Sequence, residues 1–427
     1  MQNQDKDKSA LSRRDFIKVA GIGAAGLMVS SVAKSPVYAV APAKVLGAND
    51  KIKIAIVGVG GQGGGHLNMI KGQPAAQNVQ LTAVCDLWDK RRLCAAKAAG
   101  VPESKAYSDY RKLLEDNDVD AVVIGTPEHW HARIAVDAMN SGHHVYCEKP
   151  MCRTLKEVEE IQKAVAGNKV AFQVGSQGCS DAKWHTAAEQ IKLGKLGKIV
   201  WSQGSYCRNS KDGEWEYGID PDCVPGKTLD WNTWTQPVGK TEWNPEYYFR
   251  WRKFKKFSAG ILSDLFPHRL HPLMVALGPK YPVQVACIGS IIAHPDRDVA
   301  DTTQILVKFA DGSQMIIAGS TANEQGLQDM IRGHKASLYF GGSKVEIRPE
   351  RWAADEQEQE DVPVIGPGED TSEHERNWFH CIRTGDKPNC GIEVAGPVQT
   401  IVSLAEMSWK ENRMMNFDPI ARKVVKG

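Results

Sequence analysis

The chain has 427 residues, about three times the length of a typical single domain, so two domains with appendages are expected. Hydrophobic residues make up 42% and charged residues 24% of the sequence, which excludes a largely disordered, fibrous or polytopic membrane protein. The 53 Lys and Arg nearly balance the 51 Asp and Glu, and the charges form no strongly single-signed block. We therefore expect no nucleic-acid partner.

The N-terminus has the pattern of a targeting segment. Polar residues lead into Ser12-Arg13-Arg14-Asp15-Phe16-Ile17-Lys18, an apolar stretch covers residues 19–32, and small residues follow at Ala39-Val40-Ala41. This order resembles a twin-arginine export signal, and the apolar stretch is shorter than the roughly 20 residues that span a bilayer. The resemblance predicts a cleaved signal peptide at residues 1–41, the twin-arginine export machinery as a partner, and a periplasmic protein exported in the folded state. The alternative is a chance Arg pair in a disordered tail.

A dinucleotide-binding fold is predicted to begin at residue 51. The β-branched run of residues 51–57 has the length of a strand and leads into Gly58-Val59-Gly60-Gly61-Gln62-Gly63. Gly58 permits the tight turn, Gly60 allows the backbone to approach a pyrophosphate, and Gly63 allows close packing of helix on strand. The start of the following helix then offers N–H groups to the phosphates.

A second predicted strand, residues 79–85, ends in Asp86, 23 residues after Gly63. An acidic side chain there accepts hydrogen bonds from the ribose hydroxyls of an adenosine and repels a 2′-phosphate, which favours NAD over NADP. The nearby Arg91 and Arg92 leave NADP open, and the alternative role for Asp86 is that of a helix N-cap.

Strands and helices then alternate, which predicts a doubly wound parallel sheet, the Rossmann arrangement. The expected helices are 87–99, a segment near 107–115, and 130–140, and the expected strands are 120–125 and 143–147. Ligands bind such sheets beyond the carboxyl ends of the strands. Two loops follow strands in this way: Thr126-Pro127-Glu128-His129-Trp130-His131 and Glu148-Lys149-Pro150.

The order of the glycine turn, the T-P-x-x-x-H loop and the E-K-P tripeptide resembles the glucose-fructose oxidoreductase, inositol dehydrogenase and MocA family (Gfo/Idh/MocA). The segment from Gly260 to His268, with Asp264 and His268 four residues apart, matches a further mark of that family, and residues 377–388 resemble a helix near the end of such chains. The resemblance implies an NAD-binding Rossmann domain at residues 50–170. It also implies a C-terminal α/β domain with a large, mainly antiparallel open sheet at residues 171–427, a substrate cleft between them, and a homodimer or homotetramer formed through that sheet.

The resemblance also implies the site residues. Lys149, at the carboxyl end of a strand, is placed to hydrogen-bond a sugar alkoxide, and by resemblance His268 is the acid/base with Lys149 as its partner and Asp264 as the orienting residue. Asp264 and His268, four residues apart, would share one helical face, although Pro267 makes this conditional. The alternative for the pair is ordinary surface or capping chemistry. The predicted cofactor-binding residues are Gly58, Gly60, Gln62, Gly63, Asp86, Thr126, Pro127, His131, Glu148 and Lys149.

His129 and His131 invite a metal-site interpretation, which we do not favour. No carboxylate or Cys at useful spacing completes a ligand set around them, and the ten cysteines lack paired C-x-x-C spacing. We predict no metal, and a site-lining or helix-capping role for His131.

A long aromatic insertion is predicted after the start of the second domain, which follows a strand at residues 169–174. Residues 201–251 contain six of the twelve Trp, in stretches rich in Gly, Pro, Asp and Asn. Flat aromatic faces with interspersed polar groups suit sugar rings, so we predict substrate contacts from Gln177, Tyr248 and Arg250. That these aromatics only pack the insertion remains equally open. Later segments predict strands at 283–292, 302–309 and 313–319, with a hairpin turn at Asp311-Gly312, and a helix at 393–413.

Export and a dinucleotide together constrain the reaction. Outside the cytoplasm no pool of NAD is available for exchange, so we expect a tightly bound cofactor that is reoxidised or re-reduced in place. The predicted function is an exported NAD(P)-dependent oxidoreductase acting on a small carbohydrate. The alternative is a redox-neutral glycoside hydrolase that works through a transient 3-keto sugar, and a non-catalytic dinucleotide-binding protein is the third interpretation.

Overall fold

The computed structural model describes residue 47 and residues 50–426. The predicted signal peptide at residues 1–41 lies outside the described residues. Among the helices in the described part, none combines the length and the apolar character needed to cross a bilayer.

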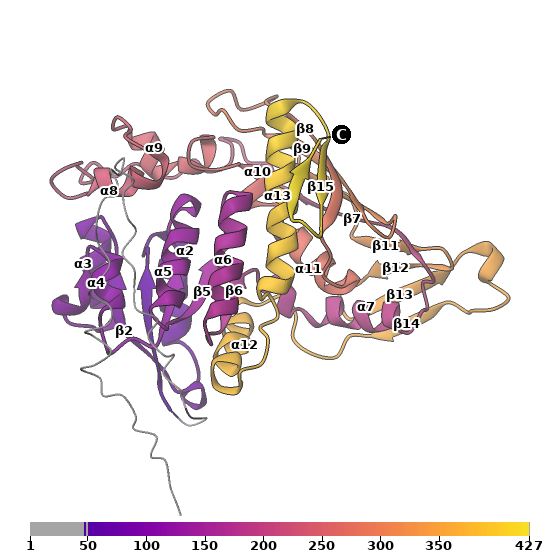
Figure 1. Cartoon of the computed structure of the whole chain (residues 1–427), viewed down its shortest axis with the longest axis horizontal. Coiled ribbons are helices and arrows are strands. Elements are labelled where there is room, and N and C mark those ends of the chain that lie inside the picture. The colour runs from indigo at the N-terminus through magenta and orange to yellow at the C-terminus, as the bar shows by residue number, and fades with distance from the viewer. Residues whose placement is uncertain (1–46, 48–49, 427) are drawn as a thin grey trace, which may run out of the picture. The chain divides into compact units, whose positions relative to one another are not determined.

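The first half of the described chain forms a six-stranded parallel sheet in the order β3-β2-β1-β4-β5-β6 (Figure 1). Its strands are rich in Val, Ile and Ala and are buried, as expected for a parallel sheet covered on both faces. The strands are β1 Ile52–Val57, β2 Val79–Cys85, β3 Ala106–Tyr107, β4 Ala121–Ile124, β5 His144–Glu148 and β6 Phe172–Gly175, and the helices are α2 Gly61–Lys71, α3 Asp89–Ala99, α4 Tyr110–Leu114, α5 His131–Asn140 and α6 Leu155–Gly167. The predicted doubly wound sheet is confirmed.

Two features of this sheet position the site. The strand order reverses between β1 and β4, which are hydrogen-bonded to each other, so the loops that follow these two strands meet at one edge. In addition, β6 pairs with β5, so this sheet continues to residue 175, beyond the predicted domain boundary at 170.

The second half forms a ten-stranded sheet in the order β14-β13-β12-β11-β7-β10-β9-β8-β15-β16. All pairs are antiparallel except β7 with β10, which confirms the predicted mainly antiparallel sheet. The strands are β7 Ile199–Cys207, β8 Pro282–Ser290, β9 Thr302–Phe309, β10 Gln314–Ser320, β11 Met330–Gly333, β12 Ala336–Phe340, β13 Lys344–Pro349, β14 Glu360–Pro363, β15 Met415–Asp418 and β16 Lys423–Val425, and the helices that pack on it are α7 Ala182–Lys192, α11 Pro267–Leu277 and α13 Ile392–Glu411. The β9–β10 hairpin turns at Asp311 and Gly312, and Gly312 has φ +86°.

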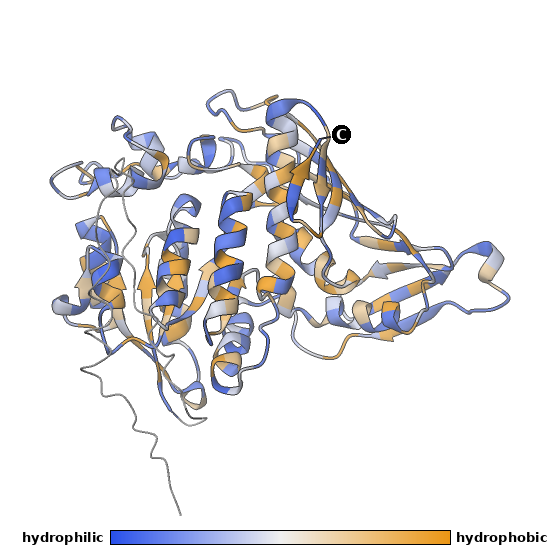
Figure 2. Cartoon of the chain, in the orientation of Figure 1, coloured by the Kyte–Doolittle hydropathy of each residue, from blue (hydrophilic) through white to orange (hydrophobic). Residues whose placement is uncertain are grey.

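Helix α12, Thr371–Thr384, returns from the second half to cover the first sheet. Its Trp378, Phe379 and Ile382 share one buried cluster with Ile54 and Ile56 of β1. Figure 2 shows the orange, hydrophobic strands of the first sheet beneath helices with blue, hydrophilic surfaces. The two halves are therefore joined by a common core.

The segment between β7 and α10 is mostly irregular, and we call residues 208–257 the aromatic segment. It contains α8 Trp231–Thr235 and α9 Pro245–Phe249 and is followed by α10 Ile261–Asp264. Trp231, Trp234, Tyr248 and Phe249 form a buried cluster with Trp88 of the first half. The aromatic segment accordingly lies over one end of the first sheet, where α8 and α9 are seen above α3 and α4 in Figure 1.

Candidate active site

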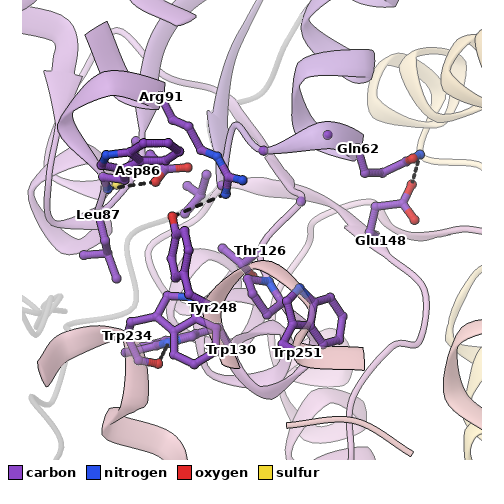
Figure 3. A pocket seen from close by; sticks show the side chains of 18 of the residues that line it. Gln62, Asp86, Leu87, Arg91, Thr126, Trp130, Glu148, Trp234, Tyr248 and Trp251 are labelled. Atoms are coloured by element: carbon purple, nitrogen blue, oxygen red, sulfur yellow. Dashed lines mark hydrogen bonds between the residues drawn. The ribbon is translucent and has the colours of Figure 1, made fainter. Parts of the chain in front are cut away.

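A cavity of about 620 Å³ lies between the edge of the first sheet and the aromatic segment (Figure 3). Its volume is in the range of small-molecule and cofactor sites. The residues that the first sheet and its loops contribute include Gly58, Gly60, Gly61, Gln62, Asp86, Arg91, Thr126, Pro127, His131, Glu148 and Lys149, and those of the aromatic segment include Tyr217, Trp234, Tyr248, Phe249, Trp251 and Arg252. Nine of the ten predicted cofactor-binding residues line this cavity, and the tenth, Gly63, instead packs against Gly58.

The glycine turn forms one side of the cavity by its backbone. Gly58 has φ +84°, which favours glycine, and a Cβ at this position would lie 2.6 Å from the Thr126 nitrogen. A Cβ at Gly63 would lie 1.8 Å from the Gly58 carbonyl oxygen. Gly60 is the N-cap of α2, so the first N–H groups of this helix face the turn. These contacts meet the requirements of a pyrophosphate-binding turn, which fits a dinucleotide.

Asp86 connects the end of β2 to this turn. Its carboxylate accepts hydrogen bonds from the Val59 nitrogen at 3.0 Å and the Trp88 nitrogen at 2.9 Å. The N-cap of α3 is Trp88, so the alternative role of Asp86 as the N-cap of that helix does not describe the structure. Burial raises the pKa of Asp86, although the nearby charge of Arg91 opposes this rise. The carboxylate thus holds the glycine turn in place and lines the cavity where a ribose is expected.

Arg91 is held among aromatic rings above this end of the cavity. Its guanidinium carbon lies 5.1 Å from the Trp88 ring centroid and 5.3 Å from that of Tyr248, and one of its nitrogens donates to the Tyr248 hydroxyl at 3.3 Å. Figure 3 shows Arg91 between Asp86 and the Gln62–Glu148 pair. Arg92 instead pairs with Asp89 at 2.7 Å, so Arg91 is the one of the two arginines that lines the cavity.

The T-P-x-x-x-H loop is fixed by its two histidines. The buried His131 bonds the Pro150 oxygen through Nδ1 at 2.7 Å and the Thr126 oxygen through Nε2 at 2.8 Å, which joins this loop to the E-K-P tripeptide. His129 bonds the Trp234 oxygen at 3.0 Å, and burial lowers its pKa to about 3. The two rings therefore face different parts of the chain. Within residues 50–426, no group of three His, Cys, Asp or Glu side chains is arranged to hold a metal ion.

Lys149 joins the two halves of the protein at the other end of the cavity. Its Nζ donates to the Asp264 carboxylate and to the Asp264 carbonyl oxygen, both at 2.8 Å. Asp264 also accepts from Arg252 Nε and from Trp215 Nε1, each at 2.9 Å. Burial alone would raise the pKa of Asp264, but the charges of Arg252 and Lys149 hold it well below its ordinary value. Asp264 is thus an anion shared by two cations.

His268 does not share a continuous helix with Asp264. Helix α10 ends at Asp264, and α11 begins at Pro267, which occupies its first turn, so the expectation of one shared helical face is not met. The His268 ring stacks on Tyr206 with centroids 4.9 Å apart. Burial and the charge of Lys149 lower the pKa of His268 to about 3, so its imidazole is neutral near pH 7.

The predicted substrate residues are placed differently from one another. Tyr248 lines the cavity, whereas Gln177 and Arg250 are absent from its wall. Arg250 is engaged within the aromatic segment, where it pairs with Glu216 at 2.7 Å and Glu246 at 2.8 Å. Asp264 and His268 do not line the cavity either, whereas Lys149 and Arg252, which both bond to Asp264, do.

Several residues of the site were not predicted from the sequence. Arg252 stacks on Trp251, with its guanidinium carbon 4.1 Å from the ring centroid, and contacts Asp264 as described above. Arg250, two residues earlier in the chain, was instead predicted from the sequence as the substrate contact. An irregular segment has no side-chain period, so the sequence does not distinguish which arginine faces the cavity. Trp215 and Tyr217 were missed for the same reason.

Comparison with known proteins agrees with this geometry. Residues 52–176 match the Gfo/Idh/MocA model described as "Oxidoreductase family, NAD-binding Rossmann fold", and residues 212–427 match the model of the family's "C-terminal alpha/beta domain". The cofactor expected from the glycine turn and Asp86, NAD, is thereby confirmed at the level of the family.

Three individual proteins illustrate the relationship. A glycosyl hydrolase family 109 protein of Solibacter usitatus is 36% identical over 225 residues, 48% of this chain and 49% of that protein. An inositol 2-dehydrogenase of Salmonella paratyphi B is 30% identical over 166 residues, 39% of this chain and 48% of the enzyme. The crystal structure of an aldose-aldose oxidoreductase from Caulobacter crescentus aligns over 86% of this chain and 100% of that chain, with a TM-score of 0.65 and 18% identity, and thus shares the fold.

The chain matches only about half the length of these curated relatives, while the two family models together extend from residue 52 to residue 427. On this basis, the chain belongs to the Gfo/Idh/MocA oxidoreductase family.

Proposed function

We propose that this protein is an exported oxidoreductase that transfers a hydride between a hydroxyl-bearing carbon of a carbohydrate and a tightly bound NAD. The observation that carries the proposal is the cavity, which has a glycine turn and Asp86 at one end and the Lys149–Asp264–Arg252 cluster at the other. The inositol 2-dehydrogenase relative supports a polyhydroxylated substrate.

The residues at the second end suit the removal of two hydrogens from a carbinol. A bound nicotinamide supplies an acceptor for the hydride that leaves the carbon. The hydroxyl proton needs a base, and by family resemblance we assign this role to His268, which does not line the cavity but is neutral near pH 7. Lys149, held by Asp264 in an orientation toward the cavity, stabilises the developing alkoxide by a hydrogen bond. In the reverse direction the same proton returns to the oxygen as the carbonyl is reduced.

Contacts between the aromatic segment and the start of α3 support a cofactor that stays bound between turnovers. The Asp89 nitrogen donates to the Thr228 oxygen at 2.9 Å, and the Asp230 nitrogen donates to the Leu87 oxygen at 3.1 Å. Lys90 also pairs with Asp220 and Asp222 at 2.7 and 2.8 Å. These bonds cover the adenosine end of the cavity. A retained cofactor favours a net reaction that is cyclic in NAD, such as oxidation of one sugar paired with reduction of another.

The test of this function begins with the small molecules released from the denatured purified protein, which mass spectrometry is expected to identify as NAD in near-stoichiometric amount. Sugars are then added singly to the folded protein, and the near-ultraviolet absorbance of reduced nicotinamide is followed. One or more sugars should produce a single-turnover signal that Lys149→Ala abolishes and Lys156→Ala, on an exposed face of α6, preserves. Bound NAD without any sugar-dependent signal would instead favour the non-catalytic interpretation.

The second candidate function is glycoside hydrolysis, and the family 109 relatives are the observation that favours it. In this reaction, oxidation at C3 acidifies the C2–H bond, elimination expels the C1 substituent, and addition of water with re-reduction restores the sugar. Product analysis in D₂O separates the two functions. Hydrolysis by this route cleaves the glycosidic bond and yields a free sugar that carries deuterium at C2, whereas dehydrogenation leaves the glycosidic bond intact.

The proposed periplasmic location rests on the twin-arginine pattern of the sequence. Replacing Arg13 and Arg14 together by Lys is expected to retain the full-length precursor in the cytoplasm, as measured by cell fractionation and immunoblotting. Export that is unchanged by this double substitution would contradict the proposal.

We also propose that two or four copies associate through the open face of the ten-stranded sheet. Ile288 and Leu306 are 73% and 54% exposed on this face, and Ile316 lies opposite Leu306 on the neighbouring strand. Exposed apolar side chains on an open sheet face suit contact with the same face of a second copy. Light scattering is expected to show a dimer or tetramer that Leu306→Glu dissociates, and a monomeric parent protein would refute the proposal.

A further inference from the structure

His66 lies behind the reacting end of the cavity and contacts two carboxylates. It belongs to α2, three residues after Gly63, and its side chain is fully buried. Its Nε2 lies 2.8 Å from a Glu148 oxygen, and its Nδ1 lies 2.7 Å from a Glu375 oxygen. The three residues come from α2, the end of β5 and α12, so one imidazole joins three elements that are distant in sequence.

The two carboxylates have further partners that fix their orientation. The Glu148 oxygen bonded by His66 also accepts from Gln62 Nε2 at 3.1 Å, as Figure 3 shows, and the other Glu148 oxygen accepts from the Lys149 backbone nitrogen at 3.2 Å. Glu375 additionally accepts from Gln73 at 3.2 Å. Glu148 is therefore bonded both to the glycine-turn helix and to the backbone of the active-site lysine.

The geometry favours a doubly protonated ring. An imidazolium donates to both carboxylates, whereas a neutral ring would turn a lone pair toward one of them and would need that carboxyl group to carry the proton. Burial alone would lower the pKa of His66, but its hydrogen bonds to Glu148 and Glu375 raise it to about 9. Burial would likewise raise the pKa of Glu148, yet His66 holds it at about 2.

The other groups around His66 do not replace this charge. The Tyr146 ring lies edge-on with its centroid 5.1 Å away. His374 of α12 also packs on Tyr146, and burial lowers its pKa to about 4, so it is neutral. Lys149 lies beyond Glu148 and is bonded to Asp264. His66 is therefore the cation that Glu148 and Glu375 share directly.

We propose that His66 is a positioning residue of the redox site: as an imidazolium shared by Glu148 and Glu375, it fixes the E-K-P carboxylate, and with it the Lys149 backbone, against the nicotinamide end of the cavity. The same bond connects the active-site loop to α12 of the second half. The kinetic part of this inference rests on the proposed oxidoreductase function, whereas the protonation of His66 does not.

The first experiment observes the ring itself in the protein as purified. With ¹⁵N-labelled histidine, NMR is expected to show both His66 nitrogens protonated at neutral pH, with no titration until about pH 9, and the spectrum of His66→Gln assigns the signals. A neutral His66 ring at pH 7, or one that titrates near 6.5, would overturn the proposal whatever the activity of the enzyme.

The second experiment measures kinetics with the sugar that gives a signal in the wild-type protein. His66→Gln retains a donor but removes the shared charge, so kcat is expected to fall about ten- to a hundredfold with KM unchanged. Without the imidazolium, burial should raise the pKa of Glu148 again, which adds to kcat a pH dependence that is absent in the wild type. His380→Gln, the same substitution on the exposed side of α12, should leave kcat unchanged.

These outcomes separate positioning from general structural support. A His66→Gln protein of lower Tm with wild-type kcat and pH profile would refute the positioning role. If His66→Gln does not fold, triple-resonance spectra of the wild type assign the His66 signals, and Glu375→Gln, which removes one of the two carboxylates, replaces it in the titration and the kinetics. A Glu375→Gln protein with a wild-type His66 titration and wild-type kcat would then refute the positioning role. If the wild type turns over no sugar, the proposed function fails, but the NMR experiment still tests whether His66 is protonated.

Discussion

The two sides of the cavity are built in different ways. The side formed by the glycine turn, residues 58–63, is made of backbone that packs on backbone, which is possible because Gly58 and Gly63 have no Cβ atom. The side formed by the aromatic segment is made of side chains, and contacts with distant residues such as Trp88 and Lys90 hold it in place. A close backbone contact of the first kind tolerates no added Cβ atom, whereas a distributed set of side-chain contacts loses stability gradually.

The largest effect is expected from Gly63→Ala. The new Cβ would lie 1.8 Å from the Gly58 carbonyl oxygen, which is backbone and has no flexible end to move. The turn must therefore shift, and we expect loss of bound NAD together with a fall of about 3 kcal/mol or more in the free energy of unfolding. Denaturant unfolding and mass spectrometry of released cofactor measure the two effects.

Gly64→Ala is the matched control, because it is the next residue of the same helix and its Cβ would have only the Val59 oxygen, 4.0 Å away, as a neighbour. We expect this variant to keep its NAD and to gain up to about 1 kcal/mol from helix propensity. Equal losses in Gly63→Ala and Gly64→Ala would show that close packing at Gly63 is not what the turn requires.

Asp264→Asn tests the contact between the two sides of the cavity, because Asp264 bonds both Lys149 and Arg252. The substitution leaves Lys149 and Arg252 facing a neutral amide in a buried site, so we expect a loss of about 3–5 kcal/mol in the free energy of unfolding. Hydride transfer in the folded fraction should fall at least about a hundredfold, because Lys149 loses its orientation. Asp311→Asn, which breaks a half-exposed pair with Lys280 in a hairpin turn, should cost no more than about 1 kcal/mol. Similar losses in both variants would refute the central role of Asp264.

The contrast between the two sides also explains which parts of the fold were predictable. Strand β9 was predicted to the residue, because Thr303, Ile305, Val307 and Phe309 alternate with polar or exposed neighbours and a turn signal follows. The first sheet was predictable from apolar runs bounded by glycine. The packing of α12 on that sheet was not, because an amphipathic pattern shows that a helix has a buried face without showing which surface covers it.

The same reasoning applies to the site. A turn that requires glycine at fixed positions is visible as a sequence motif, so Gly58, Gly60 and Gly63 were identifiable from their spacing alone. Arg252 contacts Asp264 from an irregular segment without any period, so it was not distinguishable from Arg250. Pro267 indicated that the helix is interrupted between Asp264 and His268. The sequence did not show whether this proline begins a second helix or kinks a single one, because both give the same pattern.

The pH dependence of the free energy of unfolding tests whether the glycine-turn side of the cavity also depends on the positive charge of His66. The pKa of His66 is about 9 in the folded protein, above its ordinary value of 6.5, so the folded state binds this proton more tightly than the unfolded chain. The stabilisation is complete below pH 6.5 and is lost as the pH rises through about 9, an effect of about 3 kcal/mol. His66→Gln should lack this alkaline decrease in the free energy of unfolding, and an identical decrease in both proteins would assign it to other groups.

The smallest effect is expected from Lys90→Ala on the side of the aromatic segment. Lys90 pairs with Asp220 and Asp222, but the ammonium group is exposed to solvent and its charge is screened by salt. The backbone bonds from Asp89 and Asp230 and the aromatic cluster around Trp88 remain. We therefore expect NAD to dissociate only about twofold faster at low ionic strength, with the difference disappearing at high salt. Stopped-flow measurement of cofactor release across a salt series checks this. A tenfold or salt-independent acceleration would mean that a single ion pair, rather than many distributed contacts, holds the segment closed.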